Sequence, residues 1–157
     1  MAGSLWKQNI DSETTEQLTD GNGYDYQPDC NAGGDKIIFV RYNGASTELM
    51  LLDLQNNNTF SLTNNKAVNL EPRWSPDGKE ILFISTLNTK HFLLYKANIS
   101  NNTLSEIKCL TPDRKSITKR YYYSAYDHAI NPAWSADGKK IFYISNQEIE
   151  HGTGDMV

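Results

Sequence analysis

The chain has 157 residues, a formal net charge of −4, and nine Tyr, five Phe and three Trp. This length predicts a single domain, residues 1–157, with a sizeable core. The acidic balance excludes the basic surface that nucleic-acid binding needs. No apolar run is long enough to cross a membrane. Residues 1–4 resemble an added start, and no signal peptide is present.

Short β-strands separated by turns are predicted along the whole chain, and aromatic and branched residues favour them. Three of the expected stretches are copies of one hairpin, at residues 27–41, 71–85 and 131–145. No segment shows a convincing helical period, so we expect an all-β fold. The strands expected outside the copies are residues 5–10, 14–19, 48–54, 59–63, 92–99 and 104–111.

The hairpin is built from four parts, which the last two copies contain in full. A proline, which suits the first residue of a strand, opens it at positions 28, 72 and 132. Trp74 and Trp134 follow in the last two copies, then an Asp-Gly turn, which is a strong hairpin signal. The apolar runs at 81–84 and 141–144 then predict second strands that are covered on both faces.

The spacing of the copies indicates a repeat architecture. Pro28 and Pro72 lie 44 residues apart, as do Leu18 and Leu62, which each precede a threonine. A period near this length with four strands per unit is typical of β-propeller blades of four antiparallel strands. The expected blade parts are residues 5–19, 27–63, 71–111 and 131–157.

The Trp-Ser-Pro-Asp-Gly-Lys hairpin and the later Leu-Thr resemble the TolB-type, WD-repeat-like β-propeller family. The resemblance implies a non-enzymatic binding or assembly module that holds a protein or small polar ligand at the channel mouth. It also implies a periplasmic location, with the cytoplasm as the alternative. The first copy departs from the motif, with Cys30 in place of Trp, Gly33 in place of Asp and Asp35 in place of Lys.

A second functional interpretation stays open. The chain also resembles the propeller portions of larger bacterial proteins, in which such blades accompany an amidohydrolase or peptidase domain. It would then be the accessory part of a hydrolase, or a small propeller enzyme using His128. We expect no catalytic activity in the chain itself, and no cofactor or metal.

The strand count predicts how the ring closes. The chain begins with third and fourth strands and ends with first and second strands, which makes three blades' worth. An open ring would expose apolar faces and strand edges. We therefore expect a homodimer in which two chains form a six-bladed ring. The alternative is that the chain is a fragment of a longer propeller.

Two cysteines are too few for a disulfide framework. Cys30 takes the place of the tryptophan and is expected to be buried in a first strand. Cys109 lies in an outer strand, too far from Cys30 for a bond. We predict two free thiols that act as small buried hydrophobic residues.

One loop is longer than its counterparts. Thr111 and Pro132 are 21 residues apart, whereas the equivalent pairs are 9 apart. Tyrosine and arginine are typical of recognition surfaces, so we expect partner binding here. The alternative is that the tyrosines pack the insertion onto the blade. The candidate residues are Arg120, Tyr121, Tyr122, Tyr123, Tyr126, Asp127 and His128.

Polar residues also precede the three hairpin prolines, namely Gln27, Glu71 and Asn131. Strand alternation places them and Arg73 on the face opposite the tryptophans, where they would line the channel and contact a ligand. Asp29 and Arg73 are expected to pair between neighbouring blades. The alternative is a purely structural polar ring.

Catalytic residues find little support in the sequence. His91, His128 and His151 fall in unrelated settings, and no pair has metal-ligand spacing. His128, next to Tyr126 and Asp127, is the one candidate acid–base group. There is no nucleophile elbow and no phosphate-binding loop.

Overall fold

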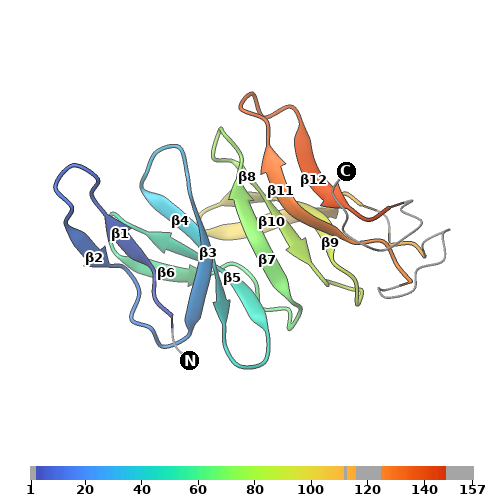
Figure 1. Ribbon diagram of the computed structural model, residues 1–157, viewed down its shortest axis with the longest axis horizontal. Coiled ribbons are helices and arrows are strands. Elements are labelled where there is room, and N and C mark those ends of the chain that lie inside the picture. The colour runs from blue at the N-terminus through green and yellow to red at the C-terminus, as the bar shows by residue number, and fades with distance from the viewer. Residues whose placement is uncertain (1–2, 112, 116–124, 148–157) are drawn as a thin grey trace.

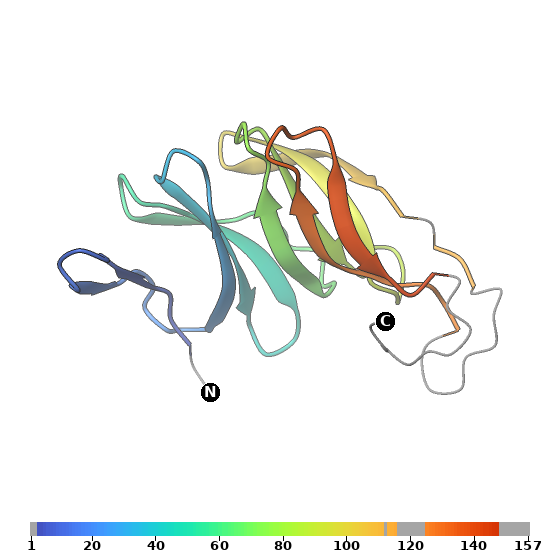
Figure 2. The same cartoon turned by 45° about the horizontal axis from the view of Figure 1, so that its top comes forward.

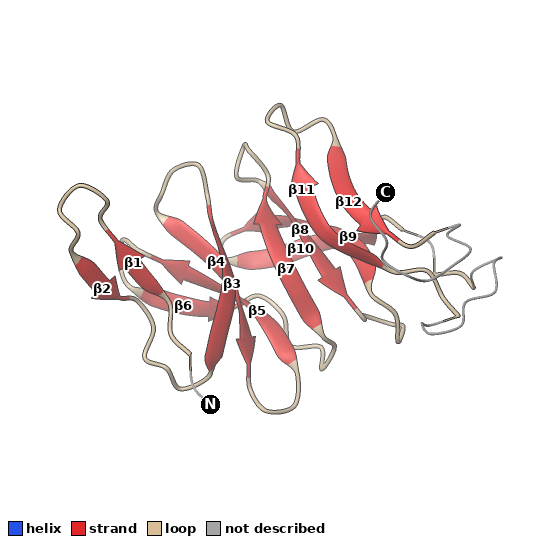
Figure 3. Ribbon diagram, viewed as in Figure 1, coloured by secondary structure: helices blue, strands red, loops and turns tan. Residues whose placement is uncertain are grey.

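The computed structural model describes residues 3–111, 113–115 and 125–147. This part of the chain contains twelve strands and no helix (Figure 3), as the repeats predict. No helix of the described part is therefore able to span a membrane. The strands are β1 (Trp6–Gln8), β2 (Thr15–Gln17), β3 (Tyr24–Cys30), β4 (Lys36–Tyr42), β5 (Thr47–Asp53), β6 (Asn58–Ser61), β7 (Asn69–Trp74), β8 (Glu80–Ser85), β9 (Leu93–Ser100), β10 (Thr103–Cys109), β11 (Ala129–Trp134) and β12 (Ile141–Ser145).

The strands form four antiparallel sheets. Two complete sheets, β3-β4-β5-β6 and β7-β8-β9-β10, lie between the two-stranded sheets β1-β2 and β11-β12. Figures 1 and 2 show the sheets side by side, with the two-stranded sheets at opposite ends of the molecule. The sheets thus follow the predicted order of two, four, four and two strands.

The second strand of each complete sheet is the centre of the core. Residues 81–84 of β8 are fully buried, as predicted, because β7 and β9 pair with both of its edges and neighbouring sheets cover both faces. The main cluster lies between the complete sheets and includes Ile38, Leu51, Phe83 and Trp74. Apolar faces of adjacent blades therefore hold the sheets together.

The prediction that residues 141–144 are covered on both faces is wrong for the chain as described. Phe142 is 59% exposed and Ile144 is 57% exposed, whereas the equivalent Leu82 and Ile84 are fully buried. The physical reason is that β12 pairs only with β11, and no described sheet follows it. The same sequence pattern is thus buried or exposed according to the strands beside it.

The prediction that each hairpin proline opens its strand is also wrong. Pro72 is the fourth residue of β7, and the pairing of β7 with β8 shifts register between Leu70 and Arg73. The residue before the proline has a positive φ in all three copies, at 52°, 54° and 52°. Such a β-bulge interrupts the hydrogen bonds, so a residue without an N–H fits there.

The recurring Leu-Thr joins the fourth strand of each blade to the third. In each copy the threonine hydroxyl accepts a leucine main-chain N–H, at 2.9, 2.9 and 3.0 Å. The carbonyl of the same leucine accepts the N–H of the Leu in Leu-Thr, at 2.8 Å in every copy. The threonines are Thr19, Thr63 and Thr111, and the leucines they bind are Leu5, Leu49 and Leu94.

We expect Thr63→Val to lower the free energy of unfolding by about 2–3 kcal/mol, because valine leaves buried polar groups without a partner. The Thr63 hydroxyl accepts the Leu49 N–H and donates to the buried Glu48 carboxylate at 2.6 Å. Thr111→Val is the control, since among described residues its hydroxyl serves only the Leu94 N–H, and we expect about 1 kcal/mol. Urea unfolding of both variants measures this. Equal losses would show that the Glu48 contact contributes nothing.

Both cysteines are free, as predicted, but both are exposed rather than buried. Cys30 lies on β3 at the position that Trp74 holds on β7. Trp74 packs against a complete sheet. The sheet that precedes β3 has only two strands, β1 and β2, among the described residues. Fewer residues therefore cover Cys30 than cover Trp74.

Candidate functional site

The connections between strands gather at two opposite ends of the sheets (Figure 1). This follows because successive connections in an antiparallel sheet alternate between the two ends of the strands. We call the end with residues 31–35, 75–79 and 135–139 the turn face. We call the end with residues 43–46, 64–68, 86–92 and the described parts of 110–128 the loop face. The described ends of the predicted insertion lie on the loop face.

A ring cluster on the loop face joins the insertion to the β8–β9 connection. The Tyr126 ring stacks on His91, with centroids 3.7 Å apart and planes at 19°. The His91 Nδ1 lies 2.9 Å from the Asp113 carboxylate at the other described end of the insertion. Tyr126 therefore packs the insertion onto the blade. Arg120, Tyr121, Tyr122 and Tyr123 lie outside the described residues.

Asp127 and His128 connect the last part of the insertion to its first part, to the β8–β9 connection and to the residue after β12. The buried Asp127 carboxylate accepts a hydrogen bond from the Arg114 Nε at 2.9 Å. The His128 Nδ1 accepts the Phe92 main-chain N–H at 3.1 Å, and the His128 N–H donates to Asn146 at 2.7 Å. Accepting at Nδ1 places the proton of a neutral imidazole on Nε2.

The prediction that His91 and His128 fall in unrelated settings is wrong. Their ring centroids lie 5.9 Å apart, edge to face at 73°. The sequence does not reveal this contact because the two histidines belong to different connections, far apart along the chain. The repeat register holds the missing signal, since a second-to-third connection and a fourth-to-first connection share one end of the sheets. His151 lies outside the described residues. Within the described residues, no group of three or more His, Cys, Asp and Glu is arranged to hold a metal ion.

The polar residues before the hairpin prolines form a hydrogen-bonded series between blades. The Gln27 Oε1 accepts the Glu71 main-chain N–H at 2.9 Å. In turn, the Glu71 Oε2 accepts the Asn131 main-chain N–H at 2.5 Å. Each side chain thus binds the bulge of the next blade. We call this series the bulge relay, and its geometry matches a structural polar ring.

The expected pair between Asp29 and Arg73 does not form. Instead, the Asp29 carboxylate accepts the Trp74 main-chain N–H at 2.7 Å. The Arg73 Nη1 donates to the Pro72 carbonyl at 3.0 Å, and the Arg73 carbonyl lies 3.3 Å from the Trp134 Nε1. Both residues join blades through main-chain atoms, which a charge pattern in the sequence does not reveal.

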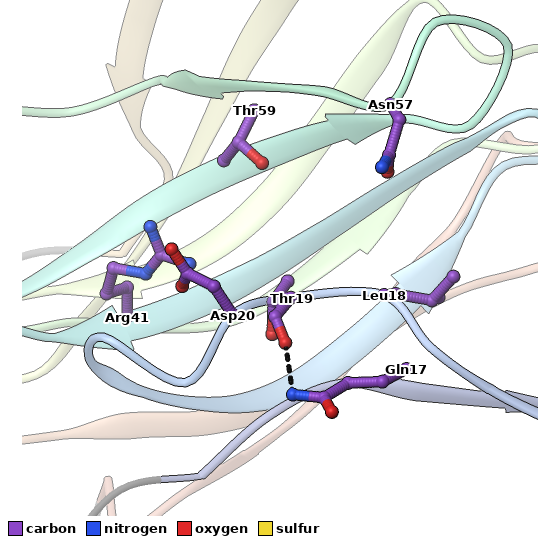
Figure 4. Close-up of a pocket in the computed structure, with 7 residues that line it drawn as sticks. All are labelled: Gln17, Leu18, Thr19, Asp20, Arg41, Asn57 and Thr59. Atoms are coloured by element: carbon purple, nitrogen blue, oxygen red, sulfur yellow. Dashed lines mark hydrogen bonds between the residues drawn. The ribbon is translucent and has the colours of Figure 1, made fainter.

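A polar pocket of about 540 Å³ opens between β1-β2 and the first complete sheet (Figure 4). Arg41 binds the buried Asp25 carboxylate through two hydrogen bonds of 2.7 and 2.8 Å, which raise the pKa of Arg41. The N–H of Asn22 lowers the pKa of Asp20, which Figure 4 shows turned toward Arg41. None of the predicted site residues lines this pocket. The lining residues are Gln17, Leu18, Thr19, Asp20, Arg41, Asn57 and Thr59.

Four-stranded antiparallel sheets repeated side by side with a common inner bulge define a β-propeller. Residues 2–151 match the model of the TolB beta propeller domain, and the chain belongs to this family.

Three known proteins illustrate the similarity. The Tol-Pal system protein TolB of Francisella tularensis subsp. mediasiatica is 26% identical, over 80% of this chain and 36% of that protein. The crystal structure of TolB from Acinetobacter baumannii superimposes with a TM-score of 0.72 at 21% identity, over 94% of this chain and 33% of that one. The tricorn protease gives a TM-score of 0.62 at 13% identity, over 90% of this chain and 13% of that one. The chain spans about a third of the length of the curated relatives it matches.

Proposed function

We propose that the chain is a non-enzymatic binding module that holds a protein partner at its loop face. The observation that supports this best is the attachment of the insertion. Asp113 at one described end and Tyr126 at the other both contact His91. A loop held at both ends by a rigid scaffold is well suited to recognition.

The sequence between those two ends supplies the binding groups of this proposal. Residues 120–123 read Arg-Tyr-Tyr-Tyr. Arginine and tyrosine dominate the energetic centres of protein interfaces, because they combine apolar area with a polar end. Curated relatives are named for a Tol-Pal system, so protein components of such a system are the first partners to test.

The hydrolase alternative has weaker support. The tricorn protease shares the fold, which does not carry function over. His128, its one candidate acid–base group, uses Nδ1 to accept a main-chain N–H and its own main-chain N–H to bind Asn146. These contacts suit a residue that positions the insertion.

We also propose that two chains form a six-bladed ring as a homodimer. The support is the exposed apolar surface of β11-β12 at one end of the molecule and the two-stranded sheet β1-β2 at the other. A two-fold symmetric dimer is the commonest way for one chain to cover two surfaces that complement each other.

Charge reversal in the insertion and on the turn face tests the loop face as the binding site. Purified Tol-Pal system proteins of Francisella tularensis serve as probes in a titration measured by interferometry. We expect Arg120→Glu to weaken the bound complex at least about tenfold, and Lys79→Glu, an equal change on the turn face, to leave its affinity unchanged. Equal affinities for both variants, or a larger loss with Lys79→Glu, would remove the support for the loop face.

A further inference from the structure

We propose that each end sheet is completed by a second copy of the chain in one fixed register, with Leu5 of one chain opposite the partner's Ile144. This inference rests on the two-chain ring proposed above and specifies its interface. The new sheet would have the order β11-β12-β1-β2, in which the last two strands come from the other chain.

The surface to be covered lies on β12. Its exposed residues Phe142 and Ile144 are equivalent to Leu82 and Ile84 of β8, which are fully buried. In the second complete sheet, β9 pairs antiparallel with the edge of β8 that lies opposite β7, and it carries apolar residues beside those of β8. A strand of the third type at the open edge of β12 would restore this arrangement.

The chain itself carries a strand of that type. Thr19 binds the Leu5 N–H as Thr63 binds the N–H of Leu49 on β5. The strand pair also has the same register, since Trp6 lies opposite Gln17 as Met50 lies opposite Ser61. By both criteria, β1 and β2 are third and fourth strands whose first and second strands are absent from the described sheet.

Both complete sheets set the same register between second and third strands. Leu49 lies opposite Val40, and Leu94 lies opposite Ile84. The equivalent of these two leucines is Leu5, and the equivalent of Val40 and Ile84 is Ile144.

The next pair in this register brings two exposed rings together. Trp6, which is 61% exposed, would lie opposite the partner's Tyr143. The equivalent residues of the second complete sheet, Phe83 and Tyr95, lie opposite each other with ring centroids 5.6 Å apart. Aromatic pairs across strands stabilise a sheet.

The bulge relay supplies a second, independent contact. Gln27 binds the bulge of Glu71, and Glu71 binds the bulge of Asn131. The next side chain in the series is that of Asn131, and the next bulge of the same kind, with φ of 52°, is that of Gln27. In the ring, the Asn131 amide oxygen would accept the main-chain N–H of the partner's Gln27.

We assign the missing strands to a second copy of the chain, because the sheets β1-β2 and β11-β12 complement each other and lie apart within one chain. Figures 1 and 2 agree that β1-β2 and β11-β12 lie at opposite ends of the molecule, so one chain as described does not join them. A two-fold rotation uses both halves of both chains and leaves no open sheet, whereas a head-to-tail series would continue as a filament.

Disulfide trapping tests the register directly. In a Cys30→Ser, Cys109→Ser background, chains carrying Trp6→Cys are mixed with chains carrying Tyr143→Cys and oxidised. Residues opposite each other in an antiparallel pair have Cα atoms about 4.5–5.5 Å apart, which is within disulfide range. We expect a linked dimer on a non-reducing gel in the mixture, and far less from either variant alone.

The control moves one cysteine by a single residue. Phe142→Cys mixed with Trp6→Cys should link poorly, because neighbouring residues of a strand point to opposite faces. Light scattering of the unsubstituted chain should give twice the mass of one 17.8 kDa chain. This second measurement does not depend on how the cysteine variants fold.

Three results would overturn the proposal: a monomer at high protein concentration, equal linking of both mixtures, or a ladder of larger oligomers. None of them bears on the loop face, because the Arg120→Glu titration reads partner affinity rather than mass. A monomer that still binds its partner through the loop face would remove the ring and keep the binding function.

Discussion

Trp74→Ala should lower the free energy of unfolding by about 3–5 kcal/mol, as the loss of a large buried ring does. Trp74 is 8% exposed and lies in the main cluster between the two complete sheets, next to Ile38 and Leu51. Removing the ring leaves a cavity lined by both sheets, which they can close only by moving relative to each other. Thermal and urea unfolding measure the loss.

Two further variants make this prediction specific. Trp134 has the same place in its hairpin but is half-buried at the end sheet. Trp134→Ala should therefore cost less, about 1–2 kcal/mol. Trp74→Phe should also cost little, because the Trp74 Nε1–H meets no acceptor among the described residues. If Trp134→Ala cost as much as Trp74→Ala, the two rings would contribute equally to the core, contrary to their burial in the structure.

Asn69→Asp should lower the free energy of unfolding by about 3–5 kcal/mol at pH 7, because it buries a charge without a counterion. Asn69 is fully buried. Its Nδ2 donates to the Thr47 carbonyl at 2.9 Å and lies 3.3 Å from the Glu48 carboxylate, and its Oδ1 accepts from Ser85 at 2.8 Å. It thus joins β7 to β5 of the preceding sheet. The aspartate would place an oxygen where the amide donates.

The same variant should gain stability as the pH falls. The introduced aspartate would be buried beside a second carboxylate, and burial and like charge raise its folded pKa above the unfolded value of about 4. The penalty of Asn69→Asp is therefore small below that value and grows as the pH rises through the raised pKa. Asn69→Ala is the control, since it removes the hydrogen bonds without adding charge. Its loss, about 1–3 kcal/mol, should vary little with pH. A pH-independent penalty for Asn69→Asp would show that the Glu48 carboxylate does not face this position.

The order of the strands could be predicted because each blade repeats its own sequence signals. Leu-Thr recurs after 44 and 48 residues, and Asp-Gly is present in two of the three hairpin copies. Each has one local meaning: the threonine hydroxyl binds a third-strand leucine, and the turn joins two inner strands. Local chemistry of this kind is visible in a single sequence.

Strand boundaries and burial were less predictable because they depend on neighbours. Pro72 looks like a strand start, yet it sits inside β7 behind a bulge whose N–H is bound by Gln27 of the preceding blade. Residues 141–144 have the pattern of a buried strand, yet Phe142 is exposed because β12 has one partner strand. His91 was missed as part of the loop face because its contact with Tyr126 joins segments 35 residues apart in the sequence.

Hydrogen exchange of the unsubstituted chain at a concentration where the ring forms tests the central claim most directly, namely that these sheets are blades of a two-chain propeller. β8 pairs on both edges, and β10 pairs on one edge only, so the chain contains its own references for an inner and an edge strand. We predict that the amides of β12 exchange as slowly as those of β8. Exchange of β12 at the rate of β10, with β8 still protected, would contradict the ring and leave β12 as an open edge.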